Sequence, residues 1–219
     1  MASAPLDALS VLAVQEVEIA PQLQHLELFT MEGLLTVLWH GPHDAERVVA
    51  ACGGAMGGLL GPADGLYQRL GTALTEQGIG MLRVGYRRPN DIALCTLDLC
   101  AAVDLAARRG AHTAVTLGHS FGGAIAIRAA CALGEPVRGV VTYATQSAGC
   151  EGAGGLDGRP LLLVHGDADE LLPVAASEMV RAIAGTGELV VLPGEGHLMS
   201  GAGDELLQRT LAFVIAALP

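Results

Sequence analysis

The sequence predicts an α/β fold: a three-layer α/β/α sandwich around a mostly parallel sheet, with antiparallel strands at its N-terminal side. Two observations support this prediction. Two strand-like segments joined by a tight turn come first, and from residue 47 onward strand-like and helix-like segments alternate. Such alternation builds parallel βαβ units whose helices cover both faces of a sheet. The 219 residues suffice for one such domain with a full core, and leave little for a second.

Strands are expected where β-branched or alternating apolar residues run between turn-forming residues. The first pair is closed by a turn near Glu32 and Gly33. No element is expected over residues 1–22, which we interpret as a loosely packed N-terminal arm of the single domain, 1–219. The expected strands are residues 23–29, 34–39, 47–51, 79–86, 113–117, 137–143, 160–165 and 188–192.

Helices are expected where apolar residues recur with the helical period. Asp64 is the expected N-cap of the first long helix, and Gly78 and Gly110 end the first two. The glycine-rich residues 146–159 are expected to form a loop. The whole interval between the neighbouring strands, residues 144–159, is too short for a lid, or cap domain, of several helices. The expected helices are residues 64–77, 91–109, 121–133, 174–183 and 204–218.

Composition excludes several classes of protein. The net charge of −11 argues against a nucleic-acid partner, which requires a basic surface. No run of eighteen uncharged apolar residues predicts a membrane span. The five cysteines are an odd number without a C-x-x-C pair, and the N-terminus has no basic signal region. We therefore expect reduced thiols and a cytoplasmic location.

The motif GHSFGG at residues 118–123 lies between a predicted buried strand and a predicted helix. It fits G-x-S-x-G, the sharp strand-to-helix turn that exposes a nucleophilic serine hydroxyl. Glycine and serine are common in turns, so Ser120 alone is equally compatible with a residue that merely caps the helix. The surrounding strand and helix favour a catalytic nucleophile.

A serine hydroxyl is a weak nucleophile at neutral pH and requires a neighbouring base, itself oriented by a carboxylate. Both groups follow later predicted strands: Asp167 and Asp169 after 160–165, and His197 after 188–192. Parallel strands bring such groups to one edge of a sheet. The order serine, acid, histidine predicts a catalytic triad of Ser120, His197 and one of these two aspartates.

Two other histidines are weaker candidates for the base. His119 is adjacent to Ser120, and neighbouring residues at a sharp turn point apart. His165 ends a strand, where a hydrogen-bonded packing role is the better interpretation. His40, His43 and Asp44 share a predicted turn, where such residues are usually solvated, so we expect no metal. No cofactor is expected either.

A tetrahedral oxyanion is best stabilised by backbone N–H groups. One should be that of Phe121, the residue after the nucleophile. The other should come from the glycine-rich loop at residues 52–58, where Gly54 is the first choice and Ala55 the next. A phosphate-binding loop is excluded because the chain contains no lysine.

The substrate is expected to be a small molecule. Met56 is a candidate for apolar contact with it, although such residues more often belong to the core. Arg87 follows the strand 79–86 and is a candidate for binding a substrate carboxylate. An ion pair that anchors a loop is the alternative role for Arg87. The oligomeric state cannot be derived from the sequence.

The chain resembles small serine hydrolases of the α/β-hydrolase fold without a cap domain, in particular the dienelactone hydrolase-like and minimal esterase group. The resemblance spans about residues 23–218 and rests on GHSFGG at 118–123, HGDAD at 165–169 with Pro173, and GEGH at 194–197. The family pattern H-G-x-x-D implies Asp169 as the catalytic acid, beside Ser120 and His197. Two departures are Cys52, where the family usually has histidine, and a serine nucleophile, where dienelactone hydrolases proper use cysteine.

From these features we predict hydrolysis of a carboxylic ester through an acyl-enzyme. A thioesterase or acyltransferase would use the same triad. A non-catalytic binding protein of this fold is the remaining alternative, although such proteins usually lose a member of the triad.

Overall fold

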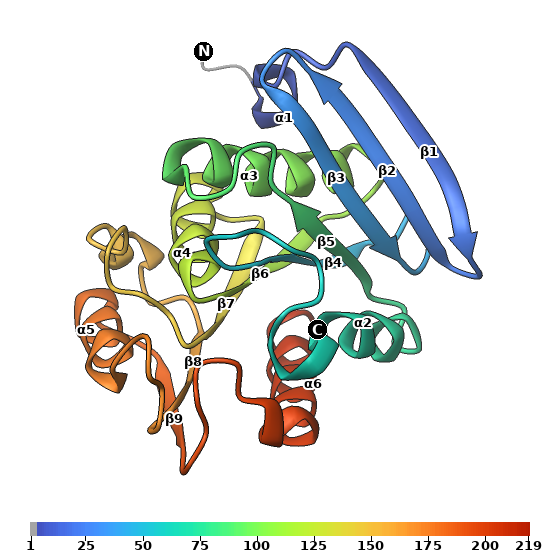
Figure 1. Cartoon of the computed structure of the whole chain (residues 1–219). Coiled ribbons are helices and arrows are strands. Elements are labelled where there is room, and N and C mark those ends of the chain that lie inside the picture. The colour runs from blue at the N-terminus through green and yellow to red at the C-terminus, as the bar shows by residue number, and fades with distance from the viewer. Residues whose placement is uncertain (1–3) are drawn as a thin grey trace.

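The computed structural model describes residues 4–219 and contains one nine-stranded sheet, ordered β1-β2-β3-β5-β4-β6-β7-β8-β9 (Figure 1). Its strands are β1 (Ala13–Ala20), β2 (Leu23–Thr30), β3 (Gly33–His40), β4 (Arg47–Cys52), β5 (Gly80–Gly85), β6 (Thr113–His119), β7 (Val137–Tyr143), β8 (Leu161–Gly166) and β9 (Glu188–Leu192). The helices are α1 (Pro5–Ala8), α2 (Pro62–Thr75), α3 (Ile92–Arg108), α4 (Phe121–Leu133), α5 (Val174–Ala184) and α6 (Gly203–Ala217), with 3₁₀ turns η1 (Ala153–Leu156) and η2 (Ser200–Ala202).

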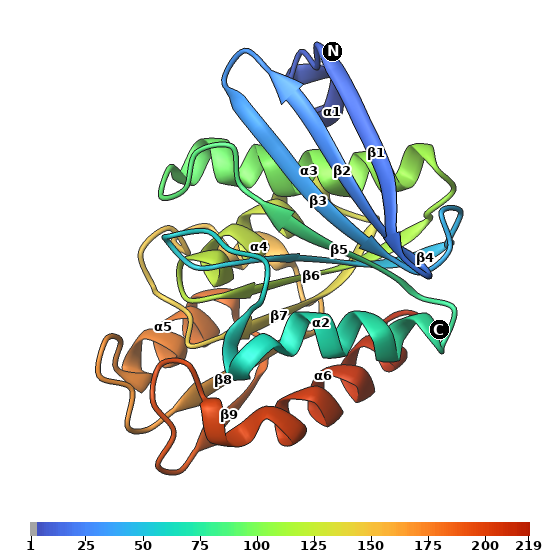
Figure 2. The ribbon, with the colours of Figure 1, turned by 45° about the vertical axis from the view of Figure 1, so that its right-hand side comes forward.

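The sheet combines an antiparallel and a parallel part. Strands β1, β2 and β3 form an antiparallel meander at one edge, and β3 joins β5 in an antiparallel pair (Figure 2). All pairs from β5 through β4 and β6 to β9 are parallel. The fold class predicted from the sequence is therefore confirmed.

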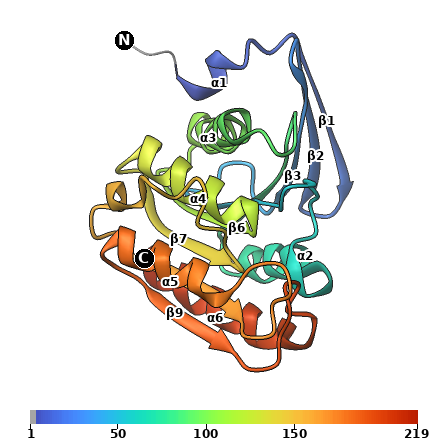
Figure 3. The ribbon, with the colours of Figure 1, turned by 60° about the vertical axis from the view of Figure 1, so that its left-hand side comes forward.

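Helices cover both faces of the sheet, and two apolar cores fill the space between. Helices α3, α4 and α5 lie on one face, and α2 and α6 on the other (Figure 3). Alternate residues of β4 serve the two cores: Val48 and Ala50 face the first, while Val49 and Ala51 face the second. Aliphatic side chains dominate both cores, as the low aromatic content requires.

Residues 4–22 differ from the expected loose arm. They form helix α1 and strand β1, and the N–H of Leu6 donates to the carboxylate of Asp104 on α3, at 2.9 Å. Leu9 is buried beside α3, whereas all eight residues of β1 are exposed. Because β1 buries neither face, no alternation of apolar and polar residues runs along its whole length: Val14 falls on the opposite face from Val17 and Ile19.

Asp64 does not cap α2, contrary to the prediction. The helix begins at Pro62, and its first turn contains Ala63, Asp64 and Gly65 with positive φ angles of 50°, 53° and 101°. This left-handed turn places the N–H of Ala63 against the carbonyl of Leu198, at 2.8 Å. The expected loop at 146–159 contains the short helix η1. Other element boundaries differ from those expected by a few residues, as helix ends commonly do.

The parallel strands position the candidate functional residues. Ser120 follows β6, and a glycine-rich loop at residues 53–61 follows β4. The loop at residues 167–173, which carries Asp167 and Asp169 and is called the acid loop below, follows β8, and the loop that carries His197 follows β9. These segments meet at the carboxyl edge of the sheet, where open α/β folds bind ligands. No helix in the described part of the chain, 4–219, has the length and apolar character needed to cross a bilayer.

Candidate active site

Ser120 occupies a strained turn between β6 and α4. Its φ and ψ angles are 58° and −119°, a conformation that a residue other than glycine rarely adopts. Its N–H donates to the carbonyl of Tyr143 at 2.8 Å, which holds the turn against β7. A Cβ at Gly118 would lie 1.9 Å from the carbonyl oxygen of Gly122, and one at Gly122 would lie 2.3 Å from that of Gly53. The glycines of the motif are thus required by close backbone packing.

The side chains of Asp169 and His197 are hydrogen-bonded to each other. The distance from His197 Nδ1 to Asp169 Oδ2 is 2.8 Å, and both side chains are buried. The second carboxylate oxygen of Asp169 accepts the N–H groups of Leu171 and Leu172, at 2.8 and 2.9 Å. Burial opposes ionisation of this carboxyl, but the bonds from Leu172, His197 and Leu171 outweigh it and lower the pKa of Asp169.

His165 completes the surroundings of Asp169. Its Nε2 lies 3.1 Å from Asp169 Oδ2 and 3.0 Å from the carbonyl oxygen of Leu172. Both of these oxygens accept hydrogen bonds, so Nε2 must carry a hydrogen. The other ring nitrogen, Nδ1, is 2.7 Å from the hydroxyl of Ser177. His165 and Ser177 are fully buried, so His165 has the expected packing role and also contacts Asp169, which the sequence did not reveal.

The alternative acid, Asp167, has a different partner. Its carboxylate accepts the N–H of Gly194 at 2.6 Å, and the residue is exposed. That contact joins the β8 and β9 loops, which approach closely: a Cβ at Gly166 would lie 2.1 Å from the carbonyl oxygen of Glu195. The structure therefore brings Asp169, and not Asp167, to His197.

Ser120 and His197 line the same cavity, which has a volume of about 420 Å³. His197 uses Nδ1 to bind Asp169, which leaves Nε2 as the nitrogen available to the serine. Within residues 4–219 no hydrogen bond joins the Ser120 hydroxyl to His197. Catalytic hydrogen bonds are often long before substrate binds, so their length in the free protein does not exclude a pair.

His119 supports the His197 loop. Its Nε2 donates to the main-chain carbonyl of His197 at 3.0 Å, and the two ring centroids lie 4.8 Å apart. Burial lowers the pKa of His119 to about 4, so the ring is neutral at physiological pH. Because the hydrogen on Nε2 is committed to this carbonyl, His119 acts on the position of His197.

The glycine-rich loop lies directly against the serine. A Cβ at Gly54 would be 3.7 Å from Ser120 Cβ, and the carbonyl of Gly54 accepts the N–H of Gly57 in a tight turn. Phe121 is the first residue of α4, so its N–H has no acceptor within the helix. Gly54 and Phe121 are thus brought beside Ser120, with Ala55 next in the same loop.

Two buried tyrosines hold this loop, and sequence reasoning did not identify either. The hydroxyl of Tyr67 donates to the carbonyl of Cys52, and that of Tyr86 to the carbonyl of Gly53, both at 2.9 Å. Cys52 itself is buried, and burial raises the pKa of its thiol to about 12. Cys52 is thus a protonated packing residue. The tyrosine hydroxyls fix the start of the loop in which Gly54 lies beside Ser120.

The two tentative substrate residues have different positions. Met56 lines the cavity and is 93% exposed. Arg87 does not line it: its buried guanidinium lies 2.5 Å from Asp98 and 2.9 Å from Glu32. The proposed carboxylate contact of Arg87 is therefore replaced by ion pairs that anchor its loop, because α3 presents Asp98 beneath it.

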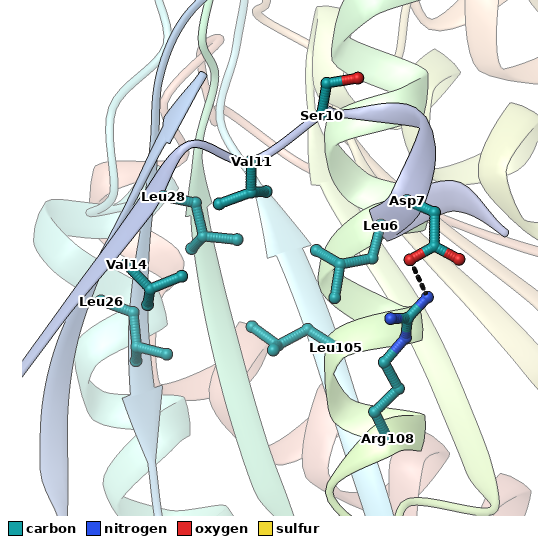
Figure 4. Close-up of a pocket in the computed structure, with 9 residues that line it drawn as sticks. All are labelled: Leu6, Asp7, Ser10, Val11, Val14, Leu26, Leu28, Leu105 and Arg108. Carbon is teal, nitrogen blue, oxygen red and sulfur yellow. Dashed lines mark ion pairs between the residues drawn. The ribbon is translucent and has the colours of Figure 1, made fainter.

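A second cavity of about 390 Å³ lies between α1, β1, β2 and α3 (Figure 4). Among the described residues that line it, Asp7 and Arg108 are the ionisable ones, and they pair with each other at 2.8 Å. The carboxylate of Asp7 is therefore not free to activate a nucleophile. Across residues 4–219 no three histidine, cysteine or acidic residues converge as a metal ion would require.

Comparison with known proteins shows likeness in structure alone. No family model matches the chain, and no curated protein does. A dienelactone hydrolase from Anabaena variabilis superposes with a TM-score of 0.75 at 20% identity, over 93% of this chain and 98% of the other. Est1E from Butyrivibrio proteoclasticus gives 0.74 at 16% identity, over 89% and 98% of the two chains.

A monoacylglycerol lipase from Paleococcus ferrophilus gives a TM-score of 0.64 at 15% identity, over 84% of this chain and 99% of the lipase. At such low identities these likenesses concern the fold. The chain has the α/β-hydrolase fold, as a single nine-stranded sheet flanked by helices, and α4 to β8 are joined without a cap domain.

Proposed function

We propose that this protein hydrolyses a carboxylic ester through an acyl-enzyme, with Ser120, His197 and Asp169 as the triad. The observation that carries the proposal is the 2.8 Å bond between Asp169 and His197 beside a cavity that also contains the strained Ser120. Est1E and a lipase share the fold, which is consistent with this activity.

The first half of the reaction is acylation. His197 Nε2 takes the proton of the Ser120 hydroxyl as its oxygen attacks the carbonyl carbon of the ester. The N–H groups of Gly54 and Phe121 stabilise the oxyanion of the tetrahedral intermediate. His197 then transfers the proton to the departing alkoxide, which leaves the acyl group on Ser120. Asp169 holds the imidazole in the required tautomer and stabilises its charged form.

The second half is deacylation by water. His197 removes a proton from water as it attacks the acyl-enzyme, and then returns the proton to Ser120. The cavity is open because only residues 144–160 separate β7 from β8, and η1 is the only helix among them. This open access for water favours hydrolysis over transfer to another acceptor. Thioester hydrolysis uses the same steps. Product analysis with added alcohols or amines distinguishes hydrolysis from acyl transfer.

The decisive variant is Ser120→Ala. It should lose hydrolysis of p-nitrophenyl acetate by about four decades and lose labelling by a fluorophosphonate, because the nucleophile is removed while the fold is retained. Ser200→Ala, at an exposed position after the His197 loop, is the control and should behave as the wild type. Undiminished labelling of Ser120→Ala would overturn the proposal, because the nucleophile would then be another residue. A wild type that is not labelled and cleaves no ester would leave a non-catalytic binding role.

A further inference from the structure

The mouth of the Ser120 cavity is surrounded by four large apolar side chains that are mostly exposed. Met56 and Leu60 come from the glycine-rich loop, Leu171 from the acid loop and Leu198 from the residue after His197. Their exposed fractions are 93%, 64%, 67% and 56%. Single exposed apolar residues are normal, but a group gathered around one concavity indicates a binding surface. We call these four residues the apolar rim.

Among residues 4–219, no charged side chain lines this cavity. The two histidines at its base are His197 and His119, and His119 is neutral because burial lowers its pKa to about 4. Arg87 is bound by Asp98 and Glu32, so its charge is compensated away from the cavity. The net charge of −11 also disfavours the approach of an anion. The site thus offers nothing to hold a substrate carboxylate.

We propose that the substrates are esters whose acyl group is an uncharged aliphatic chain held by the apolar rim. This inference rests on the proposed function and specifies its substrate class. An aliphatic chain lying across the rim removes its own surface and that of the four side chains from water, which is favourable in proportion to the area covered. A terminal carboxylate on the same chain would have to lose water without gaining a partner.

Exposed apolar residues elsewhere provide matched controls. Met179 on α5 is 55% exposed and Ile215 on α6 is 46% exposed, and neither lines the Ser120 cavity. If exposed apolar area alone governed the kinetics, through adsorption or aggregation, these positions would matter as much as the rim does.

The first experiment compares p-nitrophenyl acetate, octanoate and the half ester of suberic acid. Octanoyl and suberyl groups have the same number of carbons, but a carboxylate replaces the terminal methyl group. We expect kcat/KM for octanoate to exceed that for acetate and for suberate by about tenfold or more. Equal values for acetate and octanoate, or a preference for suberate, would overturn the inference. If suberate is preferred and Arg88→Gln abolishes that preference, the exposed Arg88 holds the substrate instead.

The second experiment changes the rim. The pair Leu60→Ser and Leu198→Ser should lower the octanoate-to-acetate ratio of kcat/KM by about fivefold or more, while Met179→Ser leaves it unchanged. Leu171→Arg should raise the suberate-to-octanoate ratio, since it places a cation at the mouth. An unchanged ratio in the rim variants would contradict the inference.

Failure of the substrate class is distinguishable from failure of the proposed function. Acetate hydrolysis that depends on Ser120 but shows no preference for octanoate would overturn only the apolar rim. A wild type that cleaves none of the three esters and resists fluorophosphonate would overturn both.

Discussion

Ser120 and Arg87 both follow strands of the parallel sheet at the same edge, yet the fold places them in opposite environments. Ser120 follows β6, and its strained backbone leaves it partly exposed in the cavity. Arg87 follows β5, and its main-chain N–H donates to Asp98 at 2.9 Å while its guanidinium binds the same carboxylate. A position at the end of a strand therefore does not by itself make a residue part of the site. Whether such a residue faces the cavity depends on its local backbone conformation and on the partners of its side chain.

Arg87→Gln tests whether Arg87 has a structural role, and it has the largest expected effect on stability. It removes the cation and leaves the buried carboxylate of Asp98 uncompensated, which should lower the free energy of unfolding by about 3–5 kcal/mol. Urea unfolding followed by circular dichroism measures the loss. At a temperature where the variant is folded, kcat and KM for p-nitrophenyl acetate should equal those of the wild type.

Arg88→Gln is the control, because Arg88 is exposed, and it should change stability by less than about 0.5 kcal/mol. A stable Arg87→Gln with a raised KM would show instead that Arg87 binds substrate.

Gly122→Ala tests the other half of the comparison, the turn that exposes Ser120. The added Cβ would lie 2.3 Å from the carbonyl oxygen of Gly53, so the turn or the glycine-rich loop must shift. We expect a loss of about 1–3 kcal/mol in stability, with a large loss of kcat because Ser120 and Gly54 move apart. Gly152→Ala, where no atom lies within 4 Å of the added Cβ, should preserve both. Normal activity in Gly122→Ala would contradict a rigid turn.

The sequence predicted what depends on local patterns. Period and turn residues located the parallel strands, and the G-x-S-x-G motif located Ser120 between β6 and α4. The order of later strands selected His197 and two aspartates, and the structure places Asp169 on His197. Contacts between distant elements could not be predicted in this way. Tyr67 looks like an ordinary core residue of a helix, and nothing near it in sequence shows that its hydroxyl binds the carbonyl of Cys52.

Arg87 illustrates the same limit. Its partner Asp98 is a buried residue of α3. A carboxylate in a predicted helix is usually expected to face solvent. Edge strand β1 escaped prediction for the opposite reason, since its side chains are exposed on both faces. The errors therefore occur where another element sets a residue's environment, as for Arg87, or where a strand buries neither face, as for β1.

Ser177→Ala has the smallest expected effect. It tests whether Ser177, through His165, helps to hold Asp169 in position. Loss of the hydroxyl leaves Nδ1 of His165 unpaired and loosens the ring that contacts Asp169, so kcat should fall about fivefold, near 1 kcal/mol, with KM unchanged. Ser177→Thr retains a hydroxyl and should recover activity.

The pKa of Asp169 is below its ordinary value of 3.8, so the stabilisation from its ionised form is present above that pH and is lost as the pH falls through the lowered value. Asp169 is thus charged throughout the range from about pH 6 to 9, and the fall in kcat should be uniform across it. A defect confined to one end of that range would contradict a purely positional effect, and an unchanged kcat would mean that Asp169 is positioned without the Ser177 hydroxyl.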